Sequence, residues 1–465
     1  MEQKRSTFTG SLGFVLAAAG SAVGLGNIWR FPYLAAKDGG GVFLLCYVIL
    51  ALTFGFALLT TEIAIGRKTK QSPLTAYTVL HKSWGWVGAL ACLIPILILP
   101  YYCAIGGWIL KYLADFLTGN ASATVADSYF TDFITSQWSP IFWFVIFMFA
   151  TMIVVYKGVD KGIERFSKVL MPILLVLILG ISCFSLTLTH TDESGVTRTG
   201  LEGFMVYVIP NFKGMTLKSF LTVLMDAMGQ LFYSISVAMG IMITYGSYVK
   251  KETNLVKSVN QIEIFDTIVA FLAGLMIVPA VYTFMGTEGM AAGPSLMFVS
   301  LPKVFAAMGS IGTLVGIAFF VMVVFAAITS SVSVMEAIVS SAIDFFKWER
   351  KKAVIIVMVY AVIAGAIVCL GYNVFYFDMH FPNGNVGQIL DLMDYVSNYV
   401  LMPVVAIGTC LLIGWVVKPK TLIEEITANG EKFGREKLYV AMVKVVTPIM
   451  LLFLLLQSLG VFGVD

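Results

Sequence analysis

The most informative part of the chain is the segment from Gly20 to Pro32, which interrupts the first long apolar run. It combines three glycines and a proline with the amide of Asn27 and the positive charge of Arg30. In hydrocarbon, a helix break exposes backbone N–H and C=O groups that are costly if unsatisfied. Such a break persists where the backbone lines a cavity and binds something, and an arginine inside a membrane span marks a functional site. The segment therefore predicts a broken helix that binds a solute and an ion near mid-membrane, as in secondary transporters.

A second cluster of small and hydroxyl-bearing residues lies in the middle of the sixth apolar run, from Gln230 to Gly240. The two interrupted runs are five spans apart. Interrupted helices at matching positions of two five-helix halves are typical of an inverted repeat. Half-helix ends at such breaks direct positive N-terminal dipoles toward anions, and the freed carbonyl oxygens are available to cations.

The composition of the whole chain predicts an all-α polytopic membrane protein. Of its 465 residues, 59% are hydrophobic and 12% are charged, and the mean hydropathy is +0.90. Soluble domains are usually about 25% charged. Apolar runs long enough to cross a bilayer recur along the chain. We expect 11 transmembrane helices, at residues 11–36, 41–66, 86–116, 139–157, 166–188, 217–247, 262–285, 309–345, 353–372, 387–417 and 438–461.

These spans form one expected transporter domain over residues 1–465, with a first repeat at 11–188, a second at 217–417 and the last span at 438–461. Most of the 30 Lys and Arg residues fall in the connecting segments of one side, which includes the N-terminus. The positive-inside rule then predicts a plasma-membrane protein with a cytoplasmic N-terminus and an external C-terminus. The first apolar run is too long for a cleavable signal.

An enzyme or a channel fits the sequence less well. A membrane enzyme needs a clustered acid, base or metal set, and no metal cluster, phosphate loop or nucleophile–base arrangement stands out in the sequence. A passive channel needs a continuous polar pore. We therefore expect no catalytic residue and no nucleic-acid partner. The sequence leaves the oligomeric state open.

Four motifs carry a resemblance to a known family. They are Gly24–Pro32, the pair Tyr101–Tyr102, Gln230–Gly240 and Ala326–Ser331. Through them the chain resembles bacterial members of the neurotransmitter:sodium symporter family, of the amino-acid-transporting type with eleven spans. The resemblance implies a 5+5 inverted repeat with broken helices 1 and 6, and sodium-coupled symport of an amino acid into the cell by alternating access. The alternative on the same fold is a proton-coupled amino-acid carrier.

The resemblance also implies two sodium ions held by oxygen atoms, which hard cations prefer as ligands. Sodium site one would use Ala22, Asn27, Ser234 and Asp266, together with the substrate carboxylate. Sodium site two would use Gly20, Val23, Ala326, Thr329 and Ser330. The alternative for the hydroxyls of site two is ordinary hydrogen bonding between helices. Related proton-coupled carriers place a cation in this second site, and the absence of Lys or Arg near Thr329 in the sequence favours sodium.

Asp266 departs from the usual family pattern. Many members carry an amide at this position, and the animal members bind chloride nearby. A carboxylate here would supply fixed negative charge beside the sodium ion and replace chloride, so we expect no chloride. The alternative is a hydrated aspartate at the cytoplasmic mouth of the seventh span.

The substrate pocket implied by the resemblance draws residues from several spans. They are Ser21, Ala22, Leu25, Gly26, Ile98, Tyr102, Tyr233, Ser234, Ser236, Met239, Ser330 and Val334. The substrate carboxylate would meet the N–H groups of Leu25 and Gly26 and the Tyr102 hydroxyl. Monoamine carriers of the family have an aspartate at the position of Gly24, so the glycine favours an α-amino acid. The uncharged, mostly apolar wall favours a neutral apolar or aromatic side chain, and plain helix packing is the alternative for its apolar members.

Two pairs of residues resemble the outer gate of the family. Arg30 and Asp394 resemble the extracellular charge pair, and Tyr102 and Tyr233 resemble the aromatic lid over the pocket. Charge pairs of this kind must break and re-form during alternating access, so they should be hydrated and weak.

Four residues resemble the inner gate. Arg5 and Asp344 match the cytoplasmic charge pair, although a simple positive-inside anchor is the alternative for Arg5. Phe8 stands where an aromatic plug is usual, and Tyr248 is expected near it.

Two further features concern the backbone. Gly162 and Pro172 match a family element at the start of the fifth span, where a missing hydrogen bond and a low helix propensity favour unwinding. Unwinding would open a water path for sodium to the cytoplasm, and a static kink is the alternative. Glu62, inside the second span, is expected to accept hydrogen bonds from N–H groups freed at the break of the sixth span.

Overall fold

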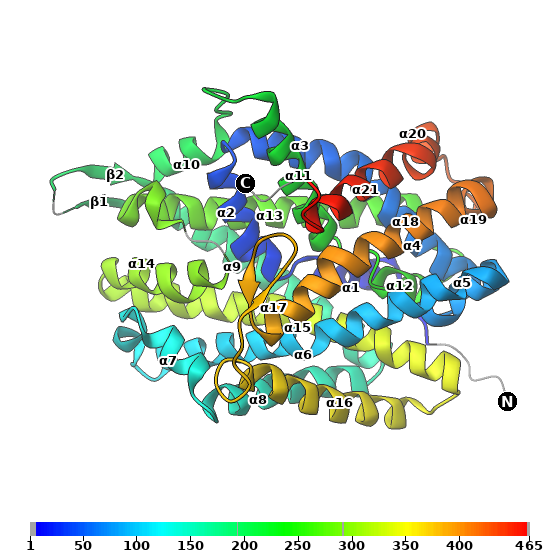
Figure 1. Ribbon diagram of the computed structural model, residues 1–465, viewed down its shortest axis with the longest axis horizontal. Coiled ribbons are helices and arrows are strands. Elements are labelled where there is room, and N and C mark those ends of the chain that lie inside the picture. Colours follow the sequence, from blue (N-terminus) through cyan, green and yellow to red (C-terminus); the bar gives the residue numbers. More distant parts are fainter. Residues whose placement is uncertain (1–5, 193, 291–292, 463–465) are drawn as a thin grey trace.

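The computed structural model describes residues 6–192, 194–290 and 293–462, and most of these are helical. Most of the long helices run roughly along the longest axis (Figure 1). The β1–β2 hairpin, α7 and α14 lie at the left end of that view, and α5, α19 and α20 lie at the right end. The first helices are α1 (Ser11–Ala22), α2 (Phe31–Lys37), α3 (Gly41–Leu50), α4 (Phe56–Thr69), α5 (Pro73–Leu80), α6 (Gly85–Leu117), α7 (Tyr129–Thr135), α8 (Ser139–Tyr156) and α9 (Arg165–Leu186).

The second part of the chain continues the same arrangement. Its helices are α10 (Gly200–Val208), α11 (Leu217–Ser234), α12 (Ile241–Tyr248), α13 (Leu255–Met285), α14 (Leu301–Ala307), α15 (Ser310–Phe346), α16 (Arg350–Leu370), α17 (Ile389–Asp394), α18 (Met402–Leu411), α19 (Lys420–Ile426), α20 (Glu436–Ala441) and α21 (Thr447–Ser458). The longest of them, α15, packs along both α6 and α9, and α12 packs against α4. These contacts bury the middle of the bundle.

Short turns of other helix types join or extend these elements. The π-helical turns are η1 (Gly26–Arg30), η2 (Ala51–Gly55), η5 (Val159–Glu164), η7 (Leu296–Ser300), η8 (Tyr395–Leu401), η9 (Leu412–Val416) and η10 (Met442–Val446), and the 3₁₀ turns are η3 (Lys82–Trp84), η4 (Ala121–Val125) and η6 (Thr287–Gly289). Turns of the π type are frequent at functional sites within α-helices. Here η1 lies in the first break and η5 opens the helix that contains Pro172.

The expected all-α class holds except for two small antiparallel hairpins. Strand β1 (Thr189–Thr191) pairs with β2 (Thr197–Thr199), and β3 (Met379–His380) pairs with β4 (Val386–Gly387). Both lie in segments that connect the expected spans. The β1–β2 strands are rich in threonine, whose branched Cβ favours strands.

Within the described residues, nine helical segments are long and apolar enough to cross a membrane. They lie where spans two to five and seven to eleven are expected. A tenth is the bent pair of α1 with the helix Gly26–Lys37, whose halves meet at 56°. The remaining expected span is divided into α11 and α12. The count of eleven therefore depends on the second broken helix, and it stays a prediction together with the inverted repeat and the domain division.

The first break has a local cause in the sequence. Helix α1 ends at Ala22, and the following Val23 has an extended backbone with φ −73° and ψ 90°. Two glycines with low helix propensity, Gly24 and Gly26, follow directly. The α-helical hydrogen-bond pattern is consequently interrupted here: the Gly24 carbonyl accepts from the Asn27 N–H at 3.2 Å, and the Gly26 carbonyl accepts from Gln230 Nε2 at 3.1 Å.

The second break is more strained than the first. Between α11 and α12, the φ angles of Ser236, Ala238 and Gly240 are 54°, 63° and 74°. A left-handed conformation is unfavourable for residues with a Cβ and requires support from the surroundings. The Ala238 N–H donates to the Glu62 carboxylate at 2.5 Å, which supplies that support. The role expected for Glu62 is confirmed.

Candidate substrate and ion sites

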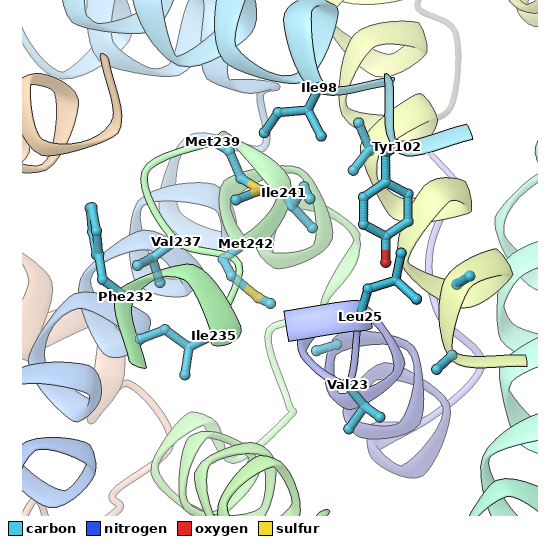
Figure 2. Packing of buried hydrophobic residues seen from close by; sticks show 14 of the residues in the cluster. Val23, Leu25, Ile98, Tyr102, Phe232, Ile235, Val237, Met239, Ile241 and Met242 are labelled. Atoms are coloured by element: carbon cyan, nitrogen blue, oxygen red, sulfur yellow. The ribbon is translucent and has the colours of Figure 1, made fainter. Parts of the chain in front are cut away.

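A cavity of about 30 Å³ lies between the two helix breaks, next to α6 and α15. It is lined by Ser21, Ala22, Gly24, Leu25, Gly26, Asn27, Ile98, Tyr102, Tyr233, Ser234, Ser236, Met239, Ile241, Ser330 and Val334. All of the residues expected to bind substrate are among them, and Gly24, Asn27 and Ile241 are additional. Figure 2 shows Ile98, Met239 and Ile241 gathered on one side and Leu25 beneath the Tyr102 ring. The structure brings the expected residues together, and their binding role stays a prediction.

Two glycines are required by the packing around this cavity. A Cβ atom at Gly26 would lie 2.7 Å from the ring of Tyr233. A Cβ atom at Gly24 would lie 3.1 Å from Ser330 Oγ and 3.2 Å from the Tyr102 hydroxyl. Because these two residues have no side chain, the backbone of the first break can approach Tyr233 at Gly26, and Ser330 and Tyr102 at Gly24.

The Tyr102 hydroxyl points into this arrangement toward Leu25 (Figure 2). It is buried and has no hydrogen-bond partner among the described residues. Burial of a hydroxyl without a partner is costly, so this oxygen is suited to a ligand group. A carboxylate next to the N–H groups of the first break is one such group.

The side chains expected for sodium site one surround Asp266, which is 1% exposed on α13. Asn27 Nδ2 donates to its carboxylate at 3.0 Å, and the Ser234 hydroxyl lies 2.8 Å away. The same hydroxyl lies 2.9 Å from Asn27 Oδ1. Tyr47 adds a longer contact of 3.3 Å. Because these neighbours are neutral, a cation among the oxygens would compensate the buried carboxylate, and the residues present fit a sodium ion.

Oxygen atoms expected for sodium site two also lie close together. Ser330 Oγ lies 3.1 Å from the Ser21 carbonyl and 3.4 Å from those of Gly20 and Val23. Thr329 Oγ1 lies 3.0 Å from the Ala326 carbonyl. A hydroxyl has one proton and cannot satisfy three carbonyls at once, so a cation would serve this set of oxygens better.

Both sets consist largely of neutral oxygen atoms. No group of three or more His, Cys, Asp or Glu residues in the described part of the chain could hold a metal ion. Carbonyl, hydroxyl and amide oxygens suit a weakly held alkali cation. Such an ion can be bound and released in each transport cycle.

This arrangement agrees with the comparison of the whole sequence against known proteins. A family model described as "Sodium:neurotransmitter symporter family" matches residues 5–140 and 128–463. The chain belongs to the sodium:neurotransmitter symporter family. As a family member it is a sodium-dependent membrane symporter and not an enzyme.

Individual relatives of the symporter cover nearly the whole chain. It is 34% identical over 472 residues to the "uncharacterized sodium-dependent transporter YhdH" of Bacillus subtilis, with 99% of each protein covered. It is 32% identical to the corresponding protein MJ1319 of Methanocaldococcus jannaschii, with 96% of this chain and 89% of the relative covered. The crystal structure of MhsT in complex with L-phenylalanine has a TM-score of 0.84 at 34% identity and covers 98% of this chain and 100% of its own.

The two members of the expected extracellular charge pair are not in direct contact. In the described part of the chain no ion pair within 4.0 Å joins Arg30 to Asp394. Arg30 lies 5.8 Å from the ring centre of Tyr399. Asp394 accepts hydrogen bonds from Tyr101 at 3.1 Å and from Asn398 at 2.6 Å. The two charges are therefore held apart by other partners, and their role as a gate stays a prediction.

Phe8, the expected aromatic plug, is 2% exposed and packs against the rings of Phe14, Tyr245 and Tyr248. Its N–H donates to the Tyr248 carbonyl at 3.1 Å. The proximity expected for the aromatic plug is thus present.

Asp344, the acidic member of the expected inner charge pair, is hydrogen-bonded to the N-terminal end of a helix. Asp344 accepts a hydrogen bond from the Ser72 N–H at 2.6 Å, at the start of α5. Its expected partner Arg5 lies outside the described residues. The inner pair therefore stays a prediction.

The expected hinge lies where helix geometry is irregular. Gly162 falls in η5, and a Cβ atom there would lie 2.1 Å from the Val154 carbonyl. Pro172 lies inside α9, where it removes one helical hydrogen bond. The geometry suits local unwinding, and the hinge role stays a prediction.

Two residues at the site, Tyr47 and Gln230, were given no role by the sequence analysis. Tyr47 reaches Asp266, and Gln230 Nε2 donates to the Gly26 carbonyl at 3.1 Å. Gln230 is fully buried in an apolar helix. A buried amide in a membrane span was the available signal, because such residues normally pair across helices.

Proposed function

We propose that this symporter carries a neutral, apolar or aromatic L-amino acid into the cell together with two sodium ions and without chloride. The proposal places it in the plasma membrane with a cytoplasmic N-terminus. Transport proceeds by alternating access, in which the outer and inner gates open in turn. The observation that carries the proposal is the buried Tyr102 hydroxyl, which lies next to the backbone of the first break at Leu25 in a cavity with a largely apolar wall.

The two ends of an amino acid fit the two kinds of surface. The carboxylate would meet Tyr102 and the N–H groups of Leu25 and Gly26, and it would complete the coordination of sodium site one. The substrate and the ion would then stabilise each other, which is the simplest basis for coupling. The apolar side chain would lie between Ile98 and Met239, where Met239 can adapt to several shapes.

A solved relative and the residues that line the cavity both support the same class of substrate. The solved relative MhsT was crystallised with L-phenylalanine. In the present chain, the cavity wall has no charged side chain among the described residues that line it. A charged substrate side chain would find no counterion there.

The test is binding of the twenty amino acids to the purified protein in sodium chloride, sodium gluconate and potassium chloride. We expect apolar or aromatic amino acids to bind in both sodium salts and not in potassium chloride. Binding that requires chloride would contradict the chloride-independent proposal. Equal binding in potassium would contradict sodium coupling and favour the proton-coupled alternative.

Tyr102→Phe is the matched variant for this test, because it removes only the hydroxyl. We expect it to weaken amino-acid binding by roughly 10- to 100-fold, which corresponds to one hydrogen bond to a charged group. Tyr47→Phe removes a hydroxyl that contacts Asp266 instead. It should preserve recognition of the substrate carboxylate.

A further inference from the structure

Two carboxylates meet at one end of the broken helices, away from the cavity. Asp38 directly follows α2, and its N–H donates to the Leu34 carbonyl at 2.8 Å. Asp226 lies on α11. Lys37 Nζ is 3.0 Å from Asp226 Oδ2 and 3.8 Å from Asp38 Oδ1. The two acidic groups therefore share a single ammonium group.

Asp38 is held in an environment that disfavours its charge. Its side chain is 5% exposed, compared with 21% for Asp226. Its Oδ2 atom is buried without a hydrogen-bond partner among the described residues. A buried carboxylate that lacks a donor on one oxygen is costly, whereas a neutral carboxyl group can itself donate.

The backbone beside Asp38 leaves it little room to turn outward. A Cβ atom at Gly40 would lie 2.2 Å from the Val206 carbonyl, and one at Gly41 would lie 2.1 Å from the Val208 carbonyl. The Asn211 N–H donates to the Gly39 carbonyl at 3.2 Å. The glycine turn that follows Asp38 therefore packs closely against the end of α10 and the residues after it.

We propose that Asp38 and Asp226 form a binding site for one proton from the outer side, and that this proton fastens α2 to α11. A protonated Asp38 donates its O–H to the Asp226 carboxylate, which already accepts from Lys37. The bond would join the outer half of the first broken helix to the outer half of the second. These are the halves that carry Arg30 and Tyr233.

The charge balance agrees with a single proton. One positive charge on Lys37 faces two carboxylates, so one negative charge remains until a proton binds. Burial and the neighbouring Asp226 carboxylate raise the pKa of Asp38 and Lys37 lowers it, and together they bring it to about 7.

The other charged and titratable groups interact electrostatically with the partners of Asp38: Tyr33 with Lys37, and Arg30 and Tyr399 with Asp226. Because the Lys37 ammonium already lies next to Asp226, a metal cation bound there would be repelled by its positive charge. The site shares no residue with either proposed sodium site, so its proton acts on the outer mouth and not as the coupled ion.

The test is the thermal unfolding of the purified full-length protein between about pH 5.5 and about pH 8.5. The pKa of Asp38 rises on folding from the ordinary value of 3.8, so the folded state binds the proton more tightly. Stability is then highest at low pH, falls as pH rises toward the folded pKa, and levels off above it. We expect Tm to fall over this window in the wild type and to lose this component in Asp38→Asn.

Asp127→Asn is the control, because that carboxylate is 86% exposed and pairs with Lys303. It should keep the wild-type pH dependence. If Asp38→Asn does not fold, Asp226→Asn is informative, because it leaves Asp38 next to Lys37 alone and should move the transition to lower pH. The proposal is overturned if both variants retain the wild-type profile, or if sodium chloride abolishes the profile that choline chloride preserves.

Discussion

Thr9 and Glu164, which are 155 residues apart in the chain, are joined by a hydrogen bond from the Thr9 N–H to Glu164 Oε2 at 2.8 Å. Lys168 Nζ donates to the other carboxylate oxygen at 2.7 Å. A Cβ atom at Gly13 would lie 2.1 Å from that oxygen, so α1 passes directly against the carboxylate. The segment before α1 is therefore tied to η5, the π-helical turn that contains Gly162.

This tie predicts that Glu164 keeps the inner end of the symporter closed. Glu164→Gln preserves the size of the side chain next to Gly13 but leaves one of its donors without an acceptor. We expect hydrogen exchange of residues 8–13 and 159–165 to become roughly 10-fold faster, as for the loss of one hydrogen bond to a charged group. Exchange is measured by mass spectrometry on the purified protein.

The control for this variant is Glu424→Gln on α19, whose side chain is 64% exposed. It should leave exchange in both segments unchanged. If Glu164→Gln exchanges like the wild type, the contact between Thr9 and Glu164 does not limit opening of the inner end.

The charge of Asp266 gives a second prediction. Asp266→Asn removes the negative charge next to the proposed sodium ion but keeps the shape of the side chain. We expect the sodium affinity, measured as the sodium dependence of amino-acid binding, to fall by roughly 10- to 100-fold. Added chloride should restore part of the loss by supplying the missing charge.

Tyr47→Phe is the matched control, because it removes a neighbour of Asp266 and leaves the carboxylate charged. Its sodium affinity should change by much less. Normal binding by Asp266→Asn in chloride-free sodium gluconate would show that the carboxylate does not replace chloride.

The features that sequence reasoning located share a physical property. Broken membrane helices require small residues and exposed backbone, and buried charges are expensive, so both are visible as exceptions in apolar runs. The segment from Gly20 to Pro32, Glu62 and Asp266 are such exceptions. Glu62 could even be assigned its partner, because a buried carboxylate needs donors and the second break offers them.

The features that the sequence analysis missed are contacts between residues that are far apart in the sequence and close in the folded protein. Tyr47 contacts Asp266 across 219 residues, and Lys37 contacts Asp226 across 189. Neither pair has a spacing that marks it, because a tyrosine in a span and a lysine at a helix end are ordinary in a membrane protein. The sequence also contains no sign that Arg30 and Asp394 are not in direct contact. Asp394 is hydrogen-bonded to Tyr101 and Asn398, and Arg30 lies near the ring of Tyr399.

Sodium site two leads to a third prediction. Thr329→Val with Ser330→Ala removes both hydroxyls of the proposed site while keeping side chains of similar or smaller size. We expect sodium-driven uptake of a bound amino acid into proteoliposomes to be abolished, because two of the five proposed ligands are lost. The measurement is uptake under an inward sodium gradient.

Ser331→Ala is the control for that double variant. The Ser331 hydroxyl lies 2.8 Å from Thr151 and 3.1 Å from the Ile328 carbonyl, away from the proposed ligands. Its uptake should remain close to that of the wild type. Unchanged sodium affinity in the double variant would remove these hydroxyls from the sodium site.

The glycine at position 24 provides the last prediction. In Gly24→Asp, the new side chain enters the space between Ser330 Oγ and the Tyr102 hydroxyl, 3.1 and 3.2 Å from its Cβ atom. Its carboxylate would take the place proposed for the substrate carboxylate and repel it. We expect amino-acid binding in sodium chloride to be lost. Gly24→Ala introduces the Cβ atom without the charge, and because its close neighbours are side-chain tips, it should weaken binding much less. Full affinity in Gly24→Asp would contradict the proposed position of the substrate carboxylate, and equal losses in both variants would assign the effect to space and not to charge.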